Sequence, residues 1–137
     1  MVKKIVMEFE KGGKVTANLL EEKTPITCKE ICNILPLTIE LIHAMWAGEE
    51  VFHKGIPITN DLPLENPARS FYDQGVLAMV PASKSFCIFY GRSIPRRGVD
   101  IDTDVTVFAL INENVEMKEI GQRVRQKGVE KVTLKLE

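Results

Sequence analysis

The chain lacks any excess of one charge and any long run of basic or acidic residues. Its 137 residues contain 18 Lys and Arg against 19 Asp and Glu, which gives a formal net charge of -1. Because proteins that bind nucleic acids need a surplus of positive charge to neutralise phosphates, this balance argues against that class. We expect no nucleic-acid partner.

The sequence also lacks a long hydrophobic run near its N-terminus. The first ten residues, MVKKIVMEFE, place two lysines before a few apolar residues and then reach Glu8 and Glu10. This stretch is far shorter than a signal-peptide core or a membrane span. We therefore expect a cytoplasmic protein with no membrane partner.

Cysteine and histidine are scarce. The three cysteines, at positions 28, 32 and 87, are odd in number and follow no secretion signal, which argues against a disulfide framework. No closely spaced C-x-x-C ligand pair occurs, and we expect all three to be small buried residues. The two histidines, His43 and His53, lack a partner at nucleophile–base spacing, although a pair across one hairpin is conceivable. We expect no metal and no cofactor.

One acidic pattern offers an alternative. Three aspartates alternate along an extended stretch: Asp100, Asp102 and Asp104. Carboxylates on one side of such a stretch could hold a hard cation, but Val105 and Ile111 stand where an EF-hand loop needs glycine and glutamate. We favour charge balance with three nearby arginines: Arg92, Arg96 and Arg97.

Alternating hydrophobicity predicts several strands. Residues 3–9 and 14–20 alternate apolar and polar side chains around Lys11-Gly12-Gly13, which is typical of a hairpin with one wet face. Residues 76–80 and 86–90 are almost wholly apolar and flank a five-residue loop, so we expect a second hairpin that is buried on both faces.

Two segments have helical spacing. Thr27-x-x-Glu30 has the spacing of a capping box, and apolar residues recur at helical intervals from Cys28 until Pro36. A second amphipathic helix is expected after residues 105–111, with Met117, Ile120 and Val124 on one face, and it ends near Gly128.

The remaining chain predicts further strands and one long connection. Residues 37–46 fit a strand or a helix equally well, and a hairpin with residues 51–53 is slightly favoured. Residues 57–74 have turn chemistry and little expected regular structure. Strands are expected at 105–111 and 131–137, with a polar loop over 91–104. Without repeats or linkers, we expect one domain over 1–137, a mainly β, closed or nearly closed antiparallel barrel with two α-helices.

The order of several short strings resembles that in cyclophilins. These strings are KVTANLLEEKTPITCKEICNIL at 14–35, FHKGIP at 52–57, GVLAM at 75–79, SFCIF at 85–89, and the stretch 107–117. The resemblance covers nearly the whole chain and implies a closed eight-stranded antiparallel barrel with two helices, a cyclophilin-like fold. It also raises peptidyl-prolyl isomerase activity as a candidate.

The chain is also similar to a smaller bacterial and archaeal cyclophilin-like family of uncharacterised proteins. The matching strings are ENPA at 65–68, GVLAMVP at 75–81 and CIFYG at 87–91. In the cyclophilin comparison, the catalytic arginine falls on Lys54, a point charge without the planar guanidinium fork. The glutamine and phenylalanine of the third strand fall on Phe86 and Ile88, which leaves an apolar surface.

The resemblance and the apolar-plus-cation chemistry together predict a groove that binds a small molecule or peptide without established catalysis. Its expected ligand-binding residues are Phe52, His53, Lys54, Arg69, Met79, Phe86 and Ile88. Alternative functions are a weak or atypical prolyl isomerase, with Lys54 as its electrostatic catalyst, and a subunit of a protein complex. A homo-oligomer is also compatible with the sequence.

Overall fold

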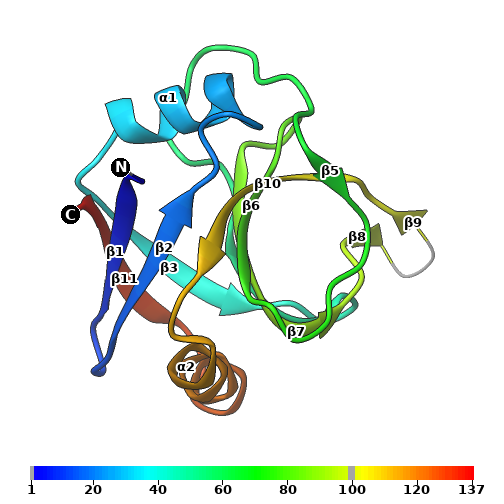
Figure 1. The fold of residues 1–137 in the computed structure, drawn as a ribbon. Helices are drawn as coiled ribbons and strands as arrows, with labels where there is room; N and C mark the ends of the chain where they lie inside the picture. The colour runs from blue at the N-terminus through cyan, green and yellow to red at the C-terminus, as the bar shows by residue number, and fades with distance from the viewer. Residues whose placement is uncertain (1, 99–100) are drawn as a thin grey trace.

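The computed structural model describes residues 2–98 and 101–137, and gives no side-chain description for Arg97, Gly98 and Ile101. Figure 1 shows a strand barrel with helices at two of its sides. In chain order the elements are β1 (Lys4–Phe9), β2 (Lys14–Leu19), α1 (Pro25–Asn33), β3 (Leu37–His43), β4 (Gly48–His53), β5 (Pro67–Ala68), β6 (Val76–Val80), β7 (Ser85–Ser93), β8 (Arg96–Gly98), β9 (Ile101–Asp102), β10 (Val105–Ile111), α2 (Asn114–Lys127) and β11 (Glu130–Leu136).

Eight strands form a closed ring. Their order is β2-β1-β11-β3-β4-β7-β6-β10, and β10 pairs back with β2 through Ala109↔Leu19. All these pairings are antiparallel, and the short β5 adds to the side of β10. Closure leaves no long strand edge open to other chains. The predicted mainly β, closed eight-stranded antiparallel barrel with two helices is confirmed.

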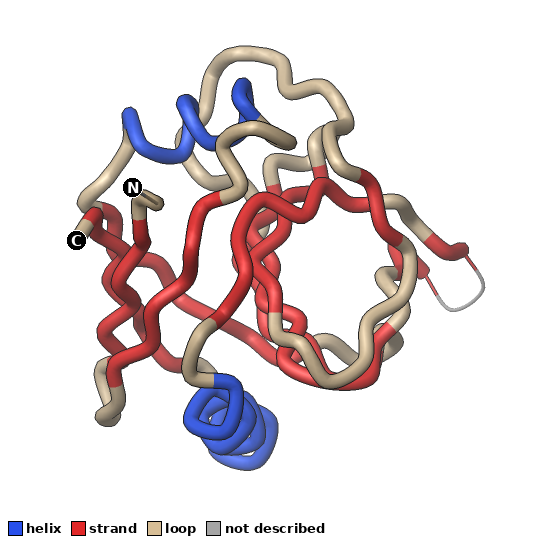
Figure 2. Tube along the Cα trace, viewed as in Figure 1, coloured by secondary structure: helices blue, strands red, loops and turns tan. Residues whose placement is uncertain are grey.

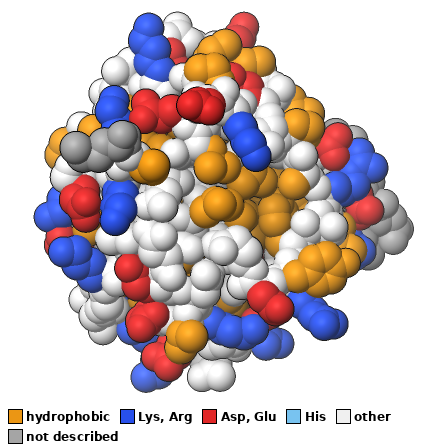
Figure 3. Space-filling view, in the orientation of Figure 1, with side chains coloured by type: hydrophobic (Ala, Val, Ile, Leu, Met, Phe, Trp, Pro, Cys, Tyr) orange, Lys and Arg blue, Asp and Glu red, His pale blue; other side chains and the backbone are white. Residues whose placement is uncertain are grey.

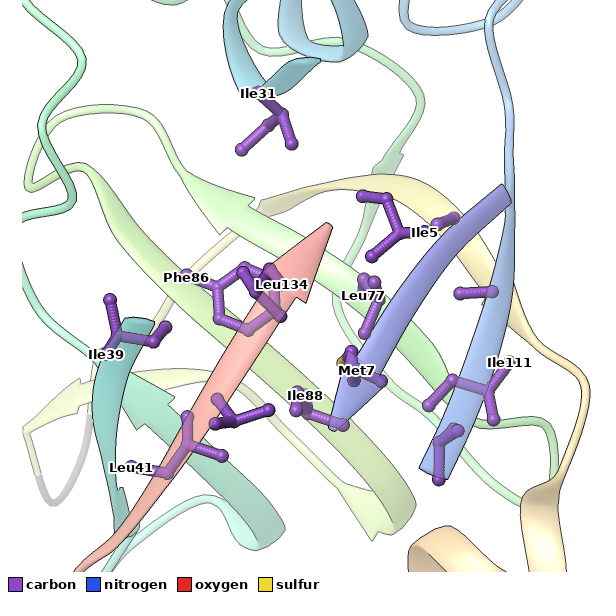
Figure 4. Close-up of a cluster of buried hydrophobic side chains, with 14 of the residues drawn as sticks. Ile5, Met7, Ile31, Ile39, Leu41, Leu77, Phe86, Ile88, Ile111 and Leu134 are labelled. Atoms are coloured by element: carbon purple, nitrogen blue, oxygen red, sulfur yellow. The ribbon is translucent and has the colours of Figure 1, made fainter. Parts of the chain in front are cut away.

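The barrel interior is filled by the inward-facing residues of the strands. Figure 4 shows residues of different strands meeting there, among them Met7, Leu77, Phe86, Ile88 and Leu134. All five are at most 1% exposed. Since full burial of one such side chain contributes about 1.5–3 kcal/mol, this interior accounts for much of the stability of the fold.

Helix α1 begins earlier than the capping-box pattern predicts. It starts at Pro25, a residue suited to a first helical turn, so Thr27 lies inside the helix and does not cap it. Both the backbone N–H and the hydroxyl of Thr27 donate to Oε1 of Glu65, at 2.8 and 2.7 Å. The free N–H groups of the first turn are therefore satisfied by a carboxylate from the distant 57–74 connection.

Helix α2 packs against the barrel through its predicted apolar face, which includes Met117, Ile120 and Val124. Gly121 allows close approach, because a Cβ there would lie 2.3 Å from the ring of Tyr90. The helix ends at Lys127, before Gly128, as predicted. No helix among residues 2–98 and 101–137 has the length and apolar character needed to cross a membrane.

The segment that fits either a helix or a strand forms strand β3. It pairs with β11 on one side, through Ile39↔Val132, and with β4 on the other, through Ile42↔Phe52. Alternate residues Ile39 and Leu41 are thereby buried in the barrel. Tertiary pairing thus selects the strand, which the local pattern alone does not.

The β6–β7 hairpin is buried on both faces, as predicted. Its outward-facing side contributes to a second apolar group, here called the outer cluster: Phe71, Val76, Ala78, Cys87, Phe89, Val105 and Val107. The 57–74 connection crosses this side (Figure 2), and Phe71 stacks on Phe89 with ring centroids 4.5 Å apart. In Figure 3, hydrophobic side chains occupy the middle of the face that looks open in the ribbon view.

Residues 91–98 and 101–104 contain strand pairing that the predicted polar loop lacks. Strand β7 continues to Ser93, whose backbone exchanges two hydrogen bonds with Phe71. Strands β8 and β9 then form a small separate ribbon. The prediction of an irregular loop was wrong here, because a polar and charged composition does not indicate which backbone groups form hydrogen bonds between strands.

Candidate functional site

A pocket of about 480 Å³ opens beside the turn between β3 and β4. Its walls come from this turn, from the outward side of β4, from the β6–β7 hairpin and from the segment around β8. The lining residues are Ile42, His43, Ala44, Met45, Trp46, Ala47, Glu50, Phe52, Lys54, Val80, Ser83, Ser85, Cys87, Pro95, Arg96 and Thr103. We call this the hairpin pocket.

Strand alternation places the central side chains of the pocket. Val51 is fully buried in the barrel interior, so its neighbours Glu50 and Phe52 point to the outer side of β4. The pairing Phe52↔Cys87 brings Cys87 of β7 to the same side. The buried residues Glu50, Ser85 and Cys87 form the floor of the pocket, and the exposed Lys54 lies at its edge.

An irregularity in the pairing of β4 with β7 positions the pocket wall that the β3–β4 turn forms. The register shifts between Gly48↔Ser93 and Glu50↔Phe89. Gly48 has a φ of +97°, and a Cβ there would lie 2.5 Å from the carbonyl oxygen of Arg92. Only glycine allows the backbone to pass this close to Arg92. This close contact determines where the β3–β4 turn ends and the pairing of β4 with β7 begins.

Glu50 is the electrostatic centre of the hairpin pocket. It is 7% exposed, and burial raises its pKa to about 7, a shift that its hydrogen bond with the Cys87 thiol partly opposes. Among the residues that the structure describes, no salt bridge includes Glu50. A carboxyl group of this kind changes charge easily near neutral pH and is typical of a functional site.

Cys87 does not provide a nucleophile. Burial and the neighbouring Glu50 raise the pKa of its thiol well above the ordinary value, so the thiolate is disfavoured. Its contribution is a weak S–H donor for Glu50 and apolar surface for the outer cluster. The floor therefore offers one titratable carboxyl group, that of Glu50, and the walls around it are apolar.

His43 belongs to a hydrogen-bond chain along one side of the pocket. Its Nδ1 lies 2.8 Å from the carbonyl oxygen of Ala44, so Nδ1 must carry the proton that is donated there. Nε2 then accepts from the hydroxyl of Tyr90 at 2.6 Å, and this hydroxyl accepts from Nε2 of Gln122 at 3.1 Å. Burial lowers the pKa of His43 and raises that of Tyr90 to about 12, which favours two neutral groups.

Arg96 links the hairpin pocket to a smaller neighbouring hollow of about 340 Å³, which also shares Trp46 and Ala47 with it. Its Nε lies 3.2 Å from Oδ1 of Asp102. Arg96 and Lys54 are thus two basic side chains in the lining of the hairpin pocket.

The predicted binding residues separate into three groups. Phe52 and Lys54 line the hairpin pocket. His53 lies on the same strand, but its Nδ1 is 2.8 Å from the carbonyl oxygen of Glu40. Arg69 is exposed and pairs with Asp104 at 2.7 Å.

The prediction for the other three residues needs correction. Met79, Phe86 and Ile88 are fully buried in the barrel interior and do not line the hairpin pocket (Figure 4). They face inward because Phe86 and Ile88 alternate with Cys87, which faces outward. The apolar surface expected from these residues is supplied instead by Trp46, Phe52 and other pocket residues.

The possible ion sites receive no support. Asp102 and Asp104 are paired with arginines, as the charge-balance interpretation predicts for Asp102, and Asp100 lies outside the described residues. His43 and His53 hydrogen-bond to different groups. In the described parts of the chain, no three His, Cys, Asp or Glu side chains gather as metal ligands.

Sequence reasoning missed Glu50. A signal was present, because Glu49 and Glu50 precede Val51 in a strand, and consecutive residues face opposite sides. With Val51 inside the barrel, Glu50 had to face the outer side, where the neighbouring hairpin was predicted to be buried. Its burial depends in addition on the inward position of Val51 and on the pairing of β4 with β7, neither of which the sequence predicts.

Comparisons with known proteins bear on the family and on the fold. The family model described as "Protein of unknown function (DUF3830)" matches residues 8–136. The chain belongs to this family. No curated protein gives a significant match.

Two solved structures have the same fold as this DUF3830 chain. McbB, solved in complex with tryptophan, aligns with a TM-score of 0.70 at 14% identity, over 96% of this chain and 44% of McbB. The hypothetical protein AF2241 from Archaeoglobus fulgidus aligns with a TM-score of 0.65 at 18% identity, over 98% of this chain and 94% of that protein. This chain thus spans less than half of McbB, and at these identities the likeness concerns the fold alone.

Proposed function

We propose that the hairpin pocket binds a small amphipathic molecule or a short peptide, and that Phe52 and Lys54 contact this ligand. The observation that carries the proposal is a concave site of about 480 Å³ in which apolar walls surround one buried carboxyl group, that of Glu50. Ligand sites of proteins have this size and this combination of apolar surface with few polar groups.

The structural comparison supports a ligand of modest size. McbB, which has the same fold over part of its length, was solved with tryptophan. A shared fold is an analogy for function, so the pocket itself carries the argument. We also propose a distant relationship to cyclophilins, with His53 and Arg69 at the margin of the ligand surface. The order of short strings supports this relationship.

Trp46 allows a direct test. It is the only tryptophan of the chain, it lines the pocket, and 51% of its surface is exposed. We expect its fluorescence to change in titrations with phenyl compounds that do not absorb at the excitation wavelength: L-phenylalanine, phenethylamine, 3-phenylpropionate and 3-phenylpropionamide. Thermal unfolding midpoints should rise with the same compounds, because ligands that bind the folded state stabilise it.

A matched pair of variants identifies the site. Val80→Phe adds bulk to the pocket wall and should weaken binding at least tenfold, whereas Val115→Phe places the same change on the exposed surface of α2 and should leave binding unchanged. If none of the compounds binds, or if both variants bind as the wild type does, the proposal is wrong.

Isomerase activity is the second candidate, because Lys54 lines the same pocket. A lysine ammonium could polarise a prolyl amide as a point charge, with less geometric precision than a guanidinium. Exchange NMR on an X-Pro peptide tests this candidate. Turnover that is lost in Lys54→Ala and retained in Lys84→Ala would establish catalysis, and wild-type exchange at the uncatalysed rate would exclude it for that peptide.

A further inference from the structure

We infer that the hairpin pocket is selective for zwitterionic ligands with an apolar body, whose protonated amine contacts Glu50 and whose anionic group lies toward Lys54. This inference rests on the proposed function and adds the chemical class of the ligand. It follows from the order of three side chains along β4 and the bend after it, and from their different burial.

The first step concerns the floor. Glu50 is 7% exposed and, within the described ranges, takes part in no salt bridge, so its carboxylate lacks a cationic partner. An ionised carboxylate in an apolar site is costly unless a positive group pairs with it. A ligand ammonium supplies this partner and several hydrogen-bond donors, whereas a ligand carboxylate at the same place would be repelled.

The second step concerns the walls. Phe52 lies next to Glu50 on the outward side of β4, and Trp46 lines the same pocket. Aromatic faces accept apolar groups and also attract organic cations through their π-electrons. The surface next to the carboxylate therefore suits an amine that is attached to an apolar or aromatic body.

The third step concerns the opposite end. Glu50 and Phe52 are two residues apart in β4 and share its outer side, and Lys54 follows two residues later at the bend after the strand, so the Cα atoms of Glu50 and Lys54 lie at most roughly 13 Å apart. Lys54 is exposed and lines the pocket edge. The order acid, aromatic ring, base is complementary to a ligand with ammonium, apolar body and anion. A free apolar amino acid or a dipeptide has these groups.

Three probes that share a phenyl group and differ in their charged groups separate the contributions of charge: L-phenylalanine, phenethylamine and 3-phenylpropionate. Affinities are measured by Trp46 fluorescence and by calorimetry. We expect L-phenylalanine to bind tightest and 3-phenylpropionate at least tenfold more weakly than L-phenylalanine. If the acid binds as tightly as the amino acid, the inference is overturned while the proposed function stands. If no probe binds, the inference is overturned, and the proposed function is overturned with it if 3-phenylpropionamide does not bind either.

Two variants and their controls assign the contacts. Glu50→Gln should lower the affinity for L-phenylalanine and phenethylamine at least tenfold without lowering the affinity for 3-phenylpropionate. Glu49→Gln, on the opposite face of the same strand, should leave the affinity for all three probes unchanged. Lys54→Met should lower the affinity for L-phenylalanine about threefold and leave the affinity for phenethylamine unchanged. Lys84→Met should change neither affinity. Unchanged amine affinity in a folded Glu50→Gln protein would overturn the inference.

Discussion

Two buried glutamates, Glu130 at the start of β11 and Glu50 on β4, show how differently one fold treats the same functional group. Glu130 is 1% exposed, and its two carboxylate oxygens accept from Nε and Nη2 of Arg123, the Nε–Oε1 distance being 2.8 Å. The backbone N–H of Lys11 donates to it as well. Glu50 is 7% exposed, but its hydrogen-bond partner is the weak thiol donor of Cys87.

The difference separates a structural carboxylate from one suited to binding. Glu130 has its partners within the chain, and Nη2 of Arg123 also donates to the carbonyl oxygen of Gly12 at 2.8 Å, which connects α2, β11 and the β1–β2 turn. Glu50 faces a pocket and lacks a comparable partner among the described residues. Burial alone therefore does not mark a functional acid, whereas burial beside a hollow without a counter-charge does.

The largest change in the free energy of unfolding should come from removing the cationic partner of Glu130. Arg123→Ala leaves Glu130 buried without its cation, and we expect a loss of about 3–5 kcal/mol in the free energy of unfolding. Urea denaturation of wild type and variant measures this loss. The double variant Arg123→Met, Glu130→Leu should recover most of it, because both charges are then replaced by apolar side chains. A single variant as stable as the wild type would contradict the structural role.

A smaller change, here a gain in the free energy of unfolding, is expected from a substitution at Glu50. Burial raises the pKa of its carboxyl from the ordinary value of 4.5 to about 7, so the folded state binds the proton more tightly than the unfolded state. This contribution is complete below pH 4.5 and is lost as pH rises to about 7, with a total of about 3 kcal/mol. Glu50→Gln should therefore be more stable than wild type above pH 7.

Urea denaturation from pH 4.5 to 8 checks the change in slope. Glu49→Gln is the matched control, since Glu49 is paired with Lys118 of α2 at 3.5 Å and faces away from the pocket. The same pH dependence in wild type and in Glu50→Gln would show that Glu50 is not the group that titrates.

A third variant tests the hydrogen-bond chain beside Glu50. Tyr90→Phe removes the hydroxyl that donates to Nε2 of His43, and we expect a loss of about 1 kcal/mol in the free energy of unfolding from the unsatisfied, half-buried nitrogen. Tyr72→Phe removes a hydroxyl from an exposed ring and should change nothing. Equal unfolding midpoints for the two variants in urea would argue against this hydrogen-bond chain.

The smallest effect should follow the loss of an exposed acid–base pair. Arg69 and Asp104 form an ion pair on the surface, where water and salt screen the attraction. Arg69→Ala should leave the unfolding midpoint and the affinity for L-phenylalanine unchanged. A clear loss of affinity would show that Arg69 contacts the ligand directly and does not lie only at the margin of the ligand surface.

The fold was more predictable from sequence than the site. Alternation in residues 3–9, 14–20 and 131–137 reports local strand geometry, and the apolar hairpin around Cys87 already indicated burial on both sides. The inward or outward direction of that hairpin was not accessible, because both faces are apolar. Phe86 and Ile88 were consequently assigned to a groove although they lie in the core.

The site depends on relations between distant segments, which local patterns do not encode. Glu50 acquires its environment from β7 and from the segment around β8, and Glu65 caps α1 from 38 residues away. Thr27 had the spacing of a cap, but a stronger acceptor from another segment meets it inside the helix. Local motifs predict which groups need a partner, whereas the tertiary fold decides which partner they receive.

The position of β11 in the ring has a consequence for synthesis on the ribosome. This strand lies between β1 and β3, so it joins two parts of the chain made long before it (Figure 1). Until β11 leaves the exit tunnel, the facing edges of β1 and β3 remain unpaired and can recruit other strands. Closure of the barrel thus requires that β11 insert between two strands that were synthesised earlier.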